Sequence, residues 1–501
     1  MEENQRAKSF TSSFNLEKAK HDKGQSEVQL RQKKRESLTQ KRRNLDTNST
    51  WISLKDHYPE NYSPEDLPSI LSCFLNPDDT SHLYIAHAVR ILLCRKDDCP
   101  LEEICNSEVM NQLNFWLNRN DHPQLQYEAA WICTNISSSS KCNLLYEIKA
   151  LESLVNLLYS PSEEVRHQVA WALGNVGANS SDERDYLLSI KVIDALGFCL
   201  KNCIKEKNIS SIVWTLTNIC RKKPLTDISE IRQVFPMILP YLKTNNVGII
   251  TDILRTVALY STYQEIQLAF TTDEGIDILK HLFSITESKT LTMLTLKIMG
   301  GLCFSRDGVT QAFLDKGMAL DIKTALYSKY NKVKKEAIWA LGNLCAETHK
   351  ELYYIIKEGI LEIIIKYAQY ESPSIRSECV WVLCNSSVVC NLEQALYLIQ
   401  LGLIEALISM LKEQIESNII LQGLSNLIDK CLKNTQTIDE NNILIKALEN
   451  CGGIEAIEKC TKNKNEKISE RAMRILETIE KQECEENLDY LMGSITTSMA
   501  F

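Results

Sequence analysis

The pair Trp-x-x-x-Asn recurs five times along this sequence at almost constant spacing, and this recurrence constrains the fold more than any other feature. Within two runs, consecutive tryptophans stand 40, 43 and 42 residues apart. The interval between the runs, from Trp214 to Trp339, is 125 residues, which leaves room for two further copies. A chain with such a period is an array of similar units, each in contact with its neighbours. The five pairs are Trp131/Asn135, Trp171/Asn175, Trp214/Asn218, Trp339/Asn343 and Trp381/Asn385.

The helical pattern persists in copies that have lost the pair, both between the runs and beyond their ends. Apolar residues recur at i, i+3, i+4 and i+7, whereas the two-residue alternation of half-buried strands does not. A period of about 42 residues with this pattern is typical of armadillo and HEAT solenoids. We therefore expect an all-α, right-handed superhelical solenoid of about ten armadillo repeats. The copies without the Trp/Asn pair are centred on Val89/Leu93, Arg255/Leu259, Lys297/Gly301, Gln422/Asn426 and Met473/Glu477.

Each copy shows the same order of local signals. A polar turn with serine and proline opens it, as at Ser160 and Glu371. A helix with the Trp/Asn pair follows, and then a glycine-bearing turn such as the one at Gly359. An apolar helix, for example residues 361–370, completes the unit. The sequence thus predicts two helices joined by a turn in each repeat.

Charge divides the 501 residues into a basic arm and an acidic body. Residues 1–50 contain 12 Lys/Arg and 7 Asp/Glu, a net charge of +5, and the remainder carries −14, which together make the net charge of −9. An acidic body is unsuited to compete for phosphates, so we expect no direct nucleic-acid binding and favour cationic ligands. No segment approaches the roughly 20 apolar residues of a membrane span, so a soluble chain without a membrane partner is expected.

The sequence predicts no catalytic or metal-binding chemistry. The 18 cysteines include no Cys-x-x-Cys pair and are interpreted as core residues of a reducing compartment. Metal-binding, phosphate-binding and nucleophile motifs are absent from the sequence, so neither an enzyme nor a cofactor is expected.

A ladder of Trp and Asn suggests a binding surface for an extended basic peptide. Residues four apart lie on one helix face, so each Trp and its Asn point the same way. Neighbouring residues such as Ala170 and Leu173 already supply a core face, which places the pair at its edge. Indole faces attract Lys and Arg side chains, and an asparagine amide can bind peptide backbone. The alternative is that these are ordinary core tryptophans. Candidate carboxylates stand three residues before Trp at Glu128, Glu336 and Glu378.

The repeated segments resemble importin-α over nearly the whole chain. This resemblance implies a nuclear import adaptor that binds basic localisation signals of cargo and shuttles between cytoplasm and nucleus. It also implies a major and a minor peptide-binding site, which correspond to the two runs of pairs. The segments that carry it are YEAAWICTNIS, VRHQVAWALGNVG, VWTLTNICRKKP, KKEAIWALGNL and IRSECVWVLCN.

Carried over by motif, the resemblance assigns residues to both sites. Asn179 stands where the family has an acidic residue that recognises a key lysine. Asp182 and Asp185, which belong to the same turn, are the two candidates to take over this role. The major site would comprise Trp131, Asn135, Gln168, Trp171, Asn175, Asn179, Trp214, Asn218 and Arg221. The minor site would comprise Lys297, Asp307, Thr310, Glu336, Trp339, Asn343, Glu378, Trp381 and Asn385.

The basic arm, residues 1–50, allows three interpretations: a nucleic-acid-binding arm, an ordinary localisation signal, or a segment that resembles the importin-β-binding region of importin-α. The last implies docking on importin-β and, in its absence, autoinhibition of the groove. The residues that carry it are Leu30, Arg31, Lys33, Lys34, Arg35, Lys41, Arg42 and Arg43.

The expected organisation has four parts: the arm, a linker over residues 51–68, the armadillo solenoid over 69–482, and an acidic tail over 483–501. By resemblance, the atypical last repeat would meet a recycling exportin of the CAS type. The rival to an import adaptor is an armadillo scaffold for signalling or adhesion, which would require a groove lined by Lys and Arg. This chain instead places Trp, Asn and Glu at the repeated positions.

Overall fold

The computed structural model describes residues 58–481, except for 60, 76–77, 286–287, 304–308 and 435–437. Side chains are not described at 433–434 and 438–442. The chain divides into two compact units, Met1–Tyr260 and Ser261–Phe501. All regular structure in the described ranges is helical, and no strand occurs there, which confirms the predicted all-α class.

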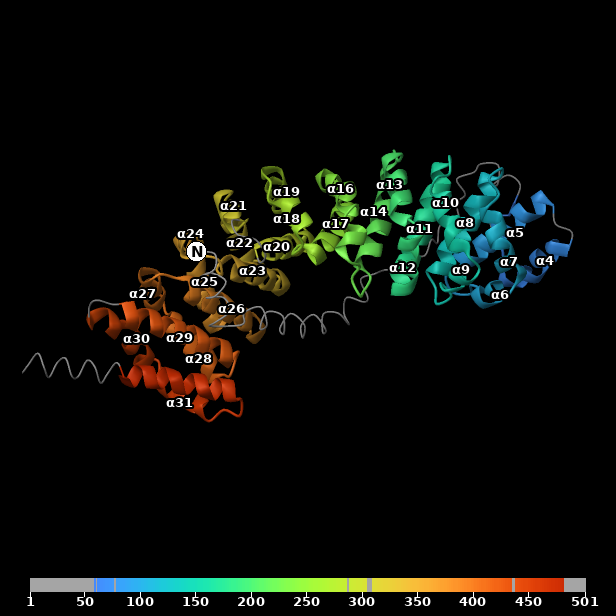
Figure 1. Cartoon of the computed structure of the whole chain (residues 1–501). Helices are drawn as coiled ribbons and strands as arrows, with labels where there is room; N and C mark the ends of the chain where they lie inside the picture. Colours follow the sequence, from blue (N-terminus) through green and yellow to red (C-terminus); the bar gives the residue numbers. More distant parts are fainter. Residues whose placement is uncertain are drawn as a thin grey trace, which may run out of the picture. The chain divides into compact units, whose positions relative to one another are not determined.

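The first unit contains five successive long helices with shorter ones between them (Figure 1). Among the described residues, the first helix begins at Pro64, inside the stretch expected to be a linker. Its helices are η2 Pro64–Asp66, α4 Leu67–Ser72, η3 Cys73–Leu75, α5 Asp79–Cys94, α6 Leu101–Cys105, α7 Glu108–Leu117, α8 Pro123–Ser137, α9 Leu144–Glu147, α10 Ala150–Leu157, α11 Glu163–Asn179, α12 Ser181–Ser189, α13 Val192–Lys201, α14 Glu206–Arg221, α15 Ile228–Ile231, α16 Val234–Ile238, η4 Leu239–Lys243 and α17 Val247–Tyr260.

The second unit repeats the same arrangement, and further helical residues follow its last labelled helix at 466–481. Its helices are α18 Gln264–Phe270, α19 Asp273–Ser284, α20 Lys289–Cys303, α21 Val309–Asp315, α22 Met318–Leu326, α23 Asn331–Leu344, α24 His349–Lys357, α25 Ile360–Tyr370, α26 Pro373–Val389, α27 Leu392–Gln400, α28 Leu403–Lys412, α29 Ser417–Asn434, α30 Ile438–Asn450 and α31 Gly453–Thr461.

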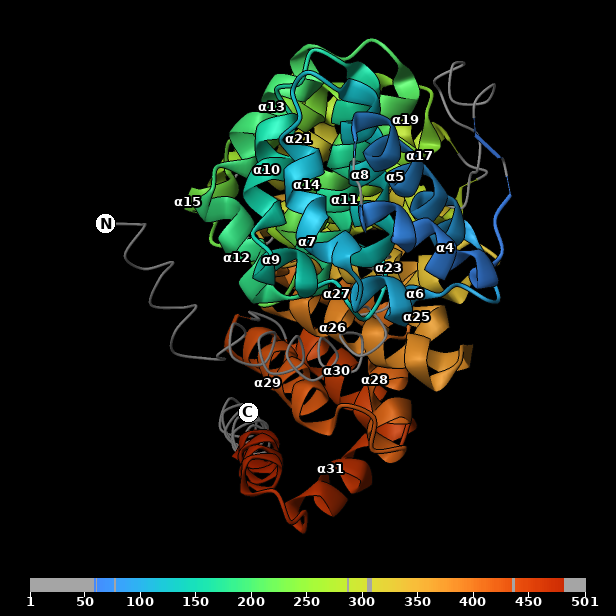
Figure 2. The same cartoon turned by 90° about the vertical axis from the view of Figure 1, so that its right-hand side faces the viewer.

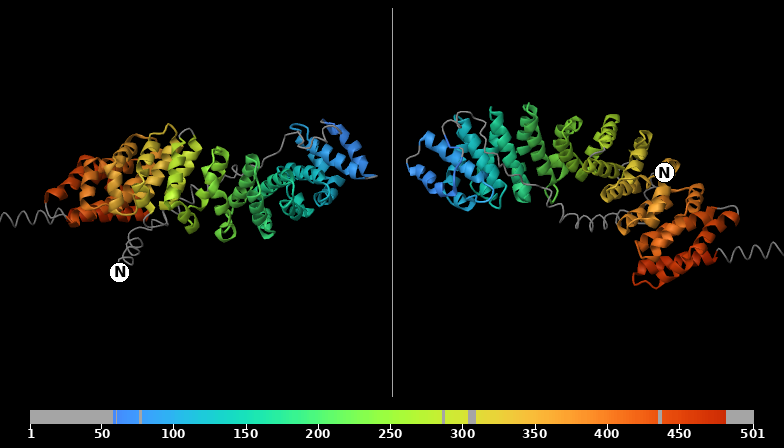
Figure 3. Two further views of the ribbon diagram at one scale, coloured as in Figure 1. Left: turned by 90° about the horizontal axis from the view of Figure 1, so that it is seen from above. Right: turned by 180° about the vertical axis from the view of Figure 1, so that it is seen from behind.

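Every predicted copy of the repeat coincides with one long helix. Within the first unit α5, α8, α11, α14 and α17 pack in sequence, and within the second α20, α23, α26 and α29 do so. The view from the N-terminal end shows α7, α10 and α13 following one another beside the long helices (Figure 2). Two further views show the same stacking of successive helical layers in each unit (Figure 3). The predicted number and phase of the repeats are thereby confirmed.

The observed repeats contain one helix more than the two that the sequence predicts. A short helix lies between the long helix and the turn, such as α12, α24 or α27, each of nine residues. The predicted glycine turn follows it: Gly359 has φ +65° and begins α25. A left-handed residue starts the third helix of other repeats as well, and the position is filled by Lys149 and Lys191 in the first unit, where the side chain makes this conformation less favourable.

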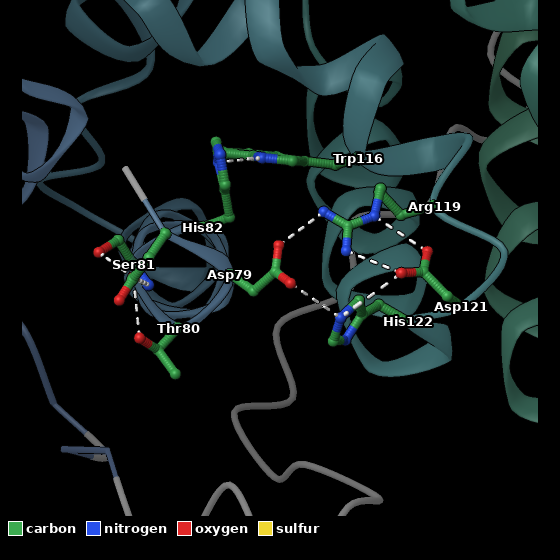
Figure 4. Close-up of polar contacts among 9 residues, drawn as sticks. Asp79, Thr80, Ser81, His82, Trp116, Arg119, Asp121 and His122 are labelled. Carbon is green, nitrogen blue, oxygen red and sulfur yellow. Dashed lines mark hydrogen bonds and ion pairs between the residues drawn. The ribbon is translucent and has the colours of Figure 1, made fainter. Parts of the chain in front are cut away.

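Polar contacts fasten the first repeats together (Figure 4). Arg119, which follows α7, holds Asp79 at the start of α5 through a 2.8 Å contact and Asp121 through two contacts of 2.9 Å. Hydrogen bonding to Arg119 lowers the pKa of Asp121 to about 2. Nearby, the Trp116 indole N–H donates to His82 Nδ1 at 3.0 Å, which ties α7 to α5. These contacts join elements some 40 residues apart in sequence.

Among the described residues no single helix is long and apolar enough to cross a membrane; only α27 and α28 taken together reach that length and composition, and they meet at 67°.

Candidate functional site

The two runs of Trp/Asn pairs form two ladders. The first ladder comprises the pairs of α8, α11 and α14, and the second comprises those of α23 and α26. In α11, α14, α23 and α26 the asparagine Nδ2 donates to a main-chain carbonyl of the preceding long helix. The acceptor stands one residue before the position that corresponds to the asparagine in that helix, so the same hydrogen bond joins these four helices to the helix before each of them. The bonds are Asn175 to Thr134 and Asn218 to Gly174 at 3.1 Å, and Asn343 to Gly300 and Asn385 to Gly342 at 2.7 Å.

These bonds change the role expected of asparagine. The sequence interpretation reserved its amide for a ligand backbone, whereas the structure uses one donor to hold the solenoid together. An amide offers two N–H donors and an oxygen with two lone pairs, so a single bond leaves capacity for a ligand. In α14, however, Arg221 Nη2 donates to the Asn218 oxygen at 2.6 Å. The primary role of these asparagines is therefore to join neighbouring long helices, and hydrogen bonding to a peptide backbone is a secondary role.

In α11 and α20, a glycine one residue before the asparagine position gives room for the tryptophan of the next repeat. A Cβ added to Gly174 would lie 2.3 Å from Trp214 Cζ3, and one added to Gly300 would lie 2.3 Å from Trp339 Cζ3. Both separations are far below van der Waals contact, so a larger residue would displace the ring. The indole rings of Trp214 and Trp339 therefore pack directly against a glycine of the preceding long helix, which fixes their positions along that helix.

The tryptophans differ in how much of the ring they present. Trp131 is 1 % exposed and Trp214 is 2 % exposed, while Trp171 and Trp381 are half-buried. Trp339 is 38 % exposed. The expectation that all five rings lie at the edge of the core is therefore wrong for Trp131 and Trp214. The second ladder presents more indole surface than the first does at its ends.

Trp131 is covered by a buried charged cluster from the preceding repeat. The Arg90 guanidinium lies 4.6 Å from the centre of its ring, and Arg90 Nε contacts Glu128 Oε2 at 2.7 Å. His87 Nδ1 lies 3.4 Å from the other Glu128 oxygen. Burial opposes ionisation of Glu128, but Arg90 and His87 outweigh it and lower its pKa. Glu128 is fully buried, so its expected role as a carboxylate for ligand cations is wrong.

The other residues assigned to the first ladder are largely engaged within the fold. Gln168 is buried, and its Nε2 donates to Thr134 Oγ1 at 2.7 Å. Arg221 lies beside Asn218 as expected, but its side chain also reaches Asp252 of α17, with 3.7 Å between Nη1 and Oδ1. Both therefore stabilise the helix stack as well as flanking the ladder.

At the end of α11, the carboxylate nearest to Asn179 is Glu183. Asn179 Nδ2 donates to Glu183 Oε2 at 2.5 Å, and Ser180 Oγ donates to the same oxygen at 2.8 Å. The two candidates expected to compensate for Asn179 lie elsewhere: Asp182 is exposed, and Asp185 contacts Arg184 at 2.6 Å. The turn thus supplies a carboxylate, but from a residue that sequence reasoning did not select.

The second ladder keeps acidic residues near its tryptophans. Glu336 is half-buried on α23, and Glu378 on α26 is buried, 3.6 Å from Lys335 Nζ. Lys297 of α20 is half-buried, whereas Thr310 of α21 is fully buried and does not face solvent. The remaining assigned residue, Asp307, lies outside the described residues.

The arm residues also lie outside the described part of the chain, as does the acidic tail. The residues in question are Leu30, Arg31, Lys33, Lys34, Arg35, Lys41, Arg42 and Arg43. Three residues of the first unit that sequence reasoning missed are Arg90, Glu183 and Lys222. A local signal existed for one of them, because Ser180 followed three residues later by Glu183 is a capping-box pattern.

Within each unit, the stacked helical repeats with their cross-helix bonds have the armadillo-repeat architecture. Residues 146–178 match the armadillo/beta-catenin-like repeat, and residues 442–489 match the atypical Arm repeat, where the last copy without the pair was expected. An engineered protein of known crystal structure, target OR497 of the Northeast Structural Genomics Consortium, superposes with a TM-score of 0.71 at 18 % identity, covering 83 % of this chain and 99 % of its own. This likeness confirms the fold.

Several curated proteins resemble this chain over most of its length. Importin subunit alpha-1b of Oryza sativa subsp. japonica is 26 % identical, covering 83 % of this chain and 79 % of the relative. Importin subunit alpha-4 of Arabidopsis thaliana is also 26 % identical and covers 99 % and 95 %. The chain has the armadillo-repeat fold and is similar over most of its length to importin-α subunits.

Proposed function

We propose that this chain binds lysine- and arginine-rich localisation signals of cargo along its two ladders and links them to importin-β through its basic arm. The observation that carries the proposal is the regular spacing of indole rings and asparagine amides along stacked long helices. Four identical cross-repeat bonds, of 2.7 to 3.1 Å, hold these groups in one register. An extended peptide has the same kind of translational repeat, so one contact pattern serves successive residues.

The charge of the body supports a cationic ligand. Residues 51–501 carry a net charge of −14, and acidic side chains stand three residues before Trp339 and Trp381. The stem of a Lys or Arg side chain packs between rings, while its charge gains roughly 0.5 to 2 kcal/mol from the ring faces. A scaffold that binds acidic partners would need Lys and Arg at these positions instead.

The arm supplies the proposed regulation. Its basic cluster, residues 27–44, resembles the importin-β-binding segment and is itself a basic peptide. When importin-β is absent, the tethered segment would compete for the ladders, because tethering gives it a high effective concentration. In the proposed cycle, a recycling exportin of the CAS type binds the atypical last repeat and releases the cargo. The chain then shuttles between cytoplasm and nucleus.

Titration of the full chain with a peptide that has two lysine- and arginine-rich clusters tests the binding function. We expect saturable binding that weakens as salt rises, because the contact is partly ionic. A matched peptide with each basic residue replaced by glutamate should not bind. Binding of the acidic peptide instead of the basic one would favour the signalling or adhesion scaffold.

Deletion of residues 1–50 tests the arm. The deleted chain should lose capture by importin-β and bind the basic peptide more tightly than the full chain, since the internal competitor is gone. Pull-down on immobilised importin-β and calorimetric titration with the peptide measure the two effects. Equal peptide affinity before and after deletion would remove autoinhibition while leaving cargo binding intact.

A further inference from the structure

The end of α11 already holds an ammonium group that belongs to the chain itself. Asn179 is the last residue of this helix, four residues after Asn175 of the first ladder. Lys222, the residue that follows α14, places its Nζ 2.6 Å from the Asn179 carbonyl oxygen. Carbonyl oxygens at a helix C-terminus carry partial negative charge and favour cations. The C-terminal end of α11, the middle helix of the first ladder, thus accepts a lysine.

The backbone around Lys222 is held in place, so this contact does not depend on a loosely placed side chain. Its N–H donates to the Asn218 carbonyl at 3.2 Å, and its own carbonyl accepts from Arg184 Nη1 at 2.8 Å. Arg184 also holds the Pro224 carbonyl at 2.7 Å and is 2 % exposed. The loop after α14 is therefore anchored with the Lys222 side chain directed to the end of α11.

A carboxylate with unused capacity lies at the same position. Glu183 is only 7 % exposed, and both Asn179 and Ser180 donate to its Oε2. Its Oε1 is buried and has no hydrogen-bond partner in the described part of the chain. A buried carboxylate oxygen without a partner is costly, and a bound cation would satisfy it.

We propose that Lys222 occupies the lysine subsite of the first ladder, and that a ligand lysine must displace it to reach Glu183. The proposal rests on the proposed function and concerns its regulation. Two ammonium groups cannot share the end of α11 without repulsion, so Lys222 lowers the affinity of the first ladder for basic peptides. Glu183 replaces the carboxylate that is missing at Asn179, and Lys222 keeps the subsite filled until a ligand competes.

A lysine at the corresponding donor position of the second unit also contacts the end of the preceding long helix. Lys430 of α29, four residues after Asn426, donates to the Val388 carbonyl at the end of α26 at 2.8 Å. Elsewhere a lysine contact at a helix end only caps the helix: Lys323 of α22 donates to the Glu358 carbonyl after α24 at 2.5 Å, on helices that carry no Trp/Asn pair. Lys323 is therefore a matched control, because it caps a helix end in the same way but lies outside both ladders.

The test compares Lys222→Met with Lys323→Met in the full chain. A peptide with one lysine cluster is titrated by fluorescence anisotropy, both in the unmodified chain and in a Trp339→Ala/Trp381→Ala background that leaves the first ladder as the binding site. Lys222→Met should bind roughly fivefold more tightly than its parent, the gain expected from one like-charge contact of about 1 kcal/mol. Lys323→Met should bind as its parent does. Adding Glu183→Gln to Lys222→Met should cancel the gain.

Equal affinity of the two lysine variants, or a gain that survives Glu183→Gln, would overturn the inference. Lys222→Gln, which keeps a donor for the helix end but no charge, must reproduce the gain; this variant also covers loss of folding in Lys222→Met, which circular dichroism detects. Absence of peptide binding in the unmodified chain would instead reject the proposed function.

Discussion

Replacing Trp214 by alanine is expected to destabilise the first unit by about 3–5 kcal/mol, the range for loss of a fully buried large aromatic side chain. The ring is 2 % exposed and lies against Gly174 of α11, where a Cβ would come within 2.3 Å of it. Its removal leaves a cavity between two long helices that are also joined by the Asn218 bond. Hydrogen exchange of α11 and α14 should report the loss locally, and denaturant unfolding should report it globally.

Trp339→Ala is the matched control, because it makes the same chemical change at the same position of another repeat. Trp339 is 38 % exposed, so its removal frees less buried volume and should cost about 1–2 kcal/mol. If the two substitutions destabilise the chain equally, burial does not distinguish the two ladders, and the structural role assigned to Trp214 is wrong.

The repeat architecture could be predicted because similar residues pack in the same way at equivalent positions of successive copies. On five of the long helices a Trp and an Asn four residues apart mark the phase, and the apolar positions between them mark the core face. Even the copies at Arg255 and Lys297, which lack both residues, keep this phase and form α17 and α20. Only a period sustained over ten helices carries that much information.

The short middle helices could not be identified from periodicity. Helix α12 has nine residues, which is too few to display a helical period clearly. Its start is specified instead by Ser180, whose side chain accepts from the Glu183 N–H. Such a helix forms because its neighbours α11 and α13, which lie in the same repeat, pack against it.

The exposure of each tryptophan depends on residues about 40 positions away. Trp131 is covered because Arg90, in the preceding repeat, is drawn over its ring while paired with Glu128. No local pattern around Trp131 distinguishes it from Trp339. Likewise, the carboxylate beside Asn179 follows from how α12 turns back on α11. The positions of the site residues were predictable, but their partners were set by packing between repeats.

The double substitution Trp339→Ala/Trp381→Ala is expected to weaken binding of a basic peptide to the full chain by about thirtyfold, the effect of removing interface tryptophans worth about 2 kcal/mol. This ladder presents the most exposed ring of the five pairs, and its acidic neighbours Glu336 and Glu378 follow the same helix faces. The first ladder has Trp131 and Trp214 buried, so it offers less ring surface to a ligand.

Calorimetric titration measures this loss, and Tyr370→Ala is the control. Tyr370 is an aromatic residue of the same unit that is 83 % exposed on α25, a helix without a Trp/Asn pair. Its removal should leave peptide affinity unchanged, because aromatic exposure alone does not create a slot between rings. If the double variant loses less than about threefold, the first ladder carries the ligand despite its buried rings, and Trp171→Ala should then show the larger effect.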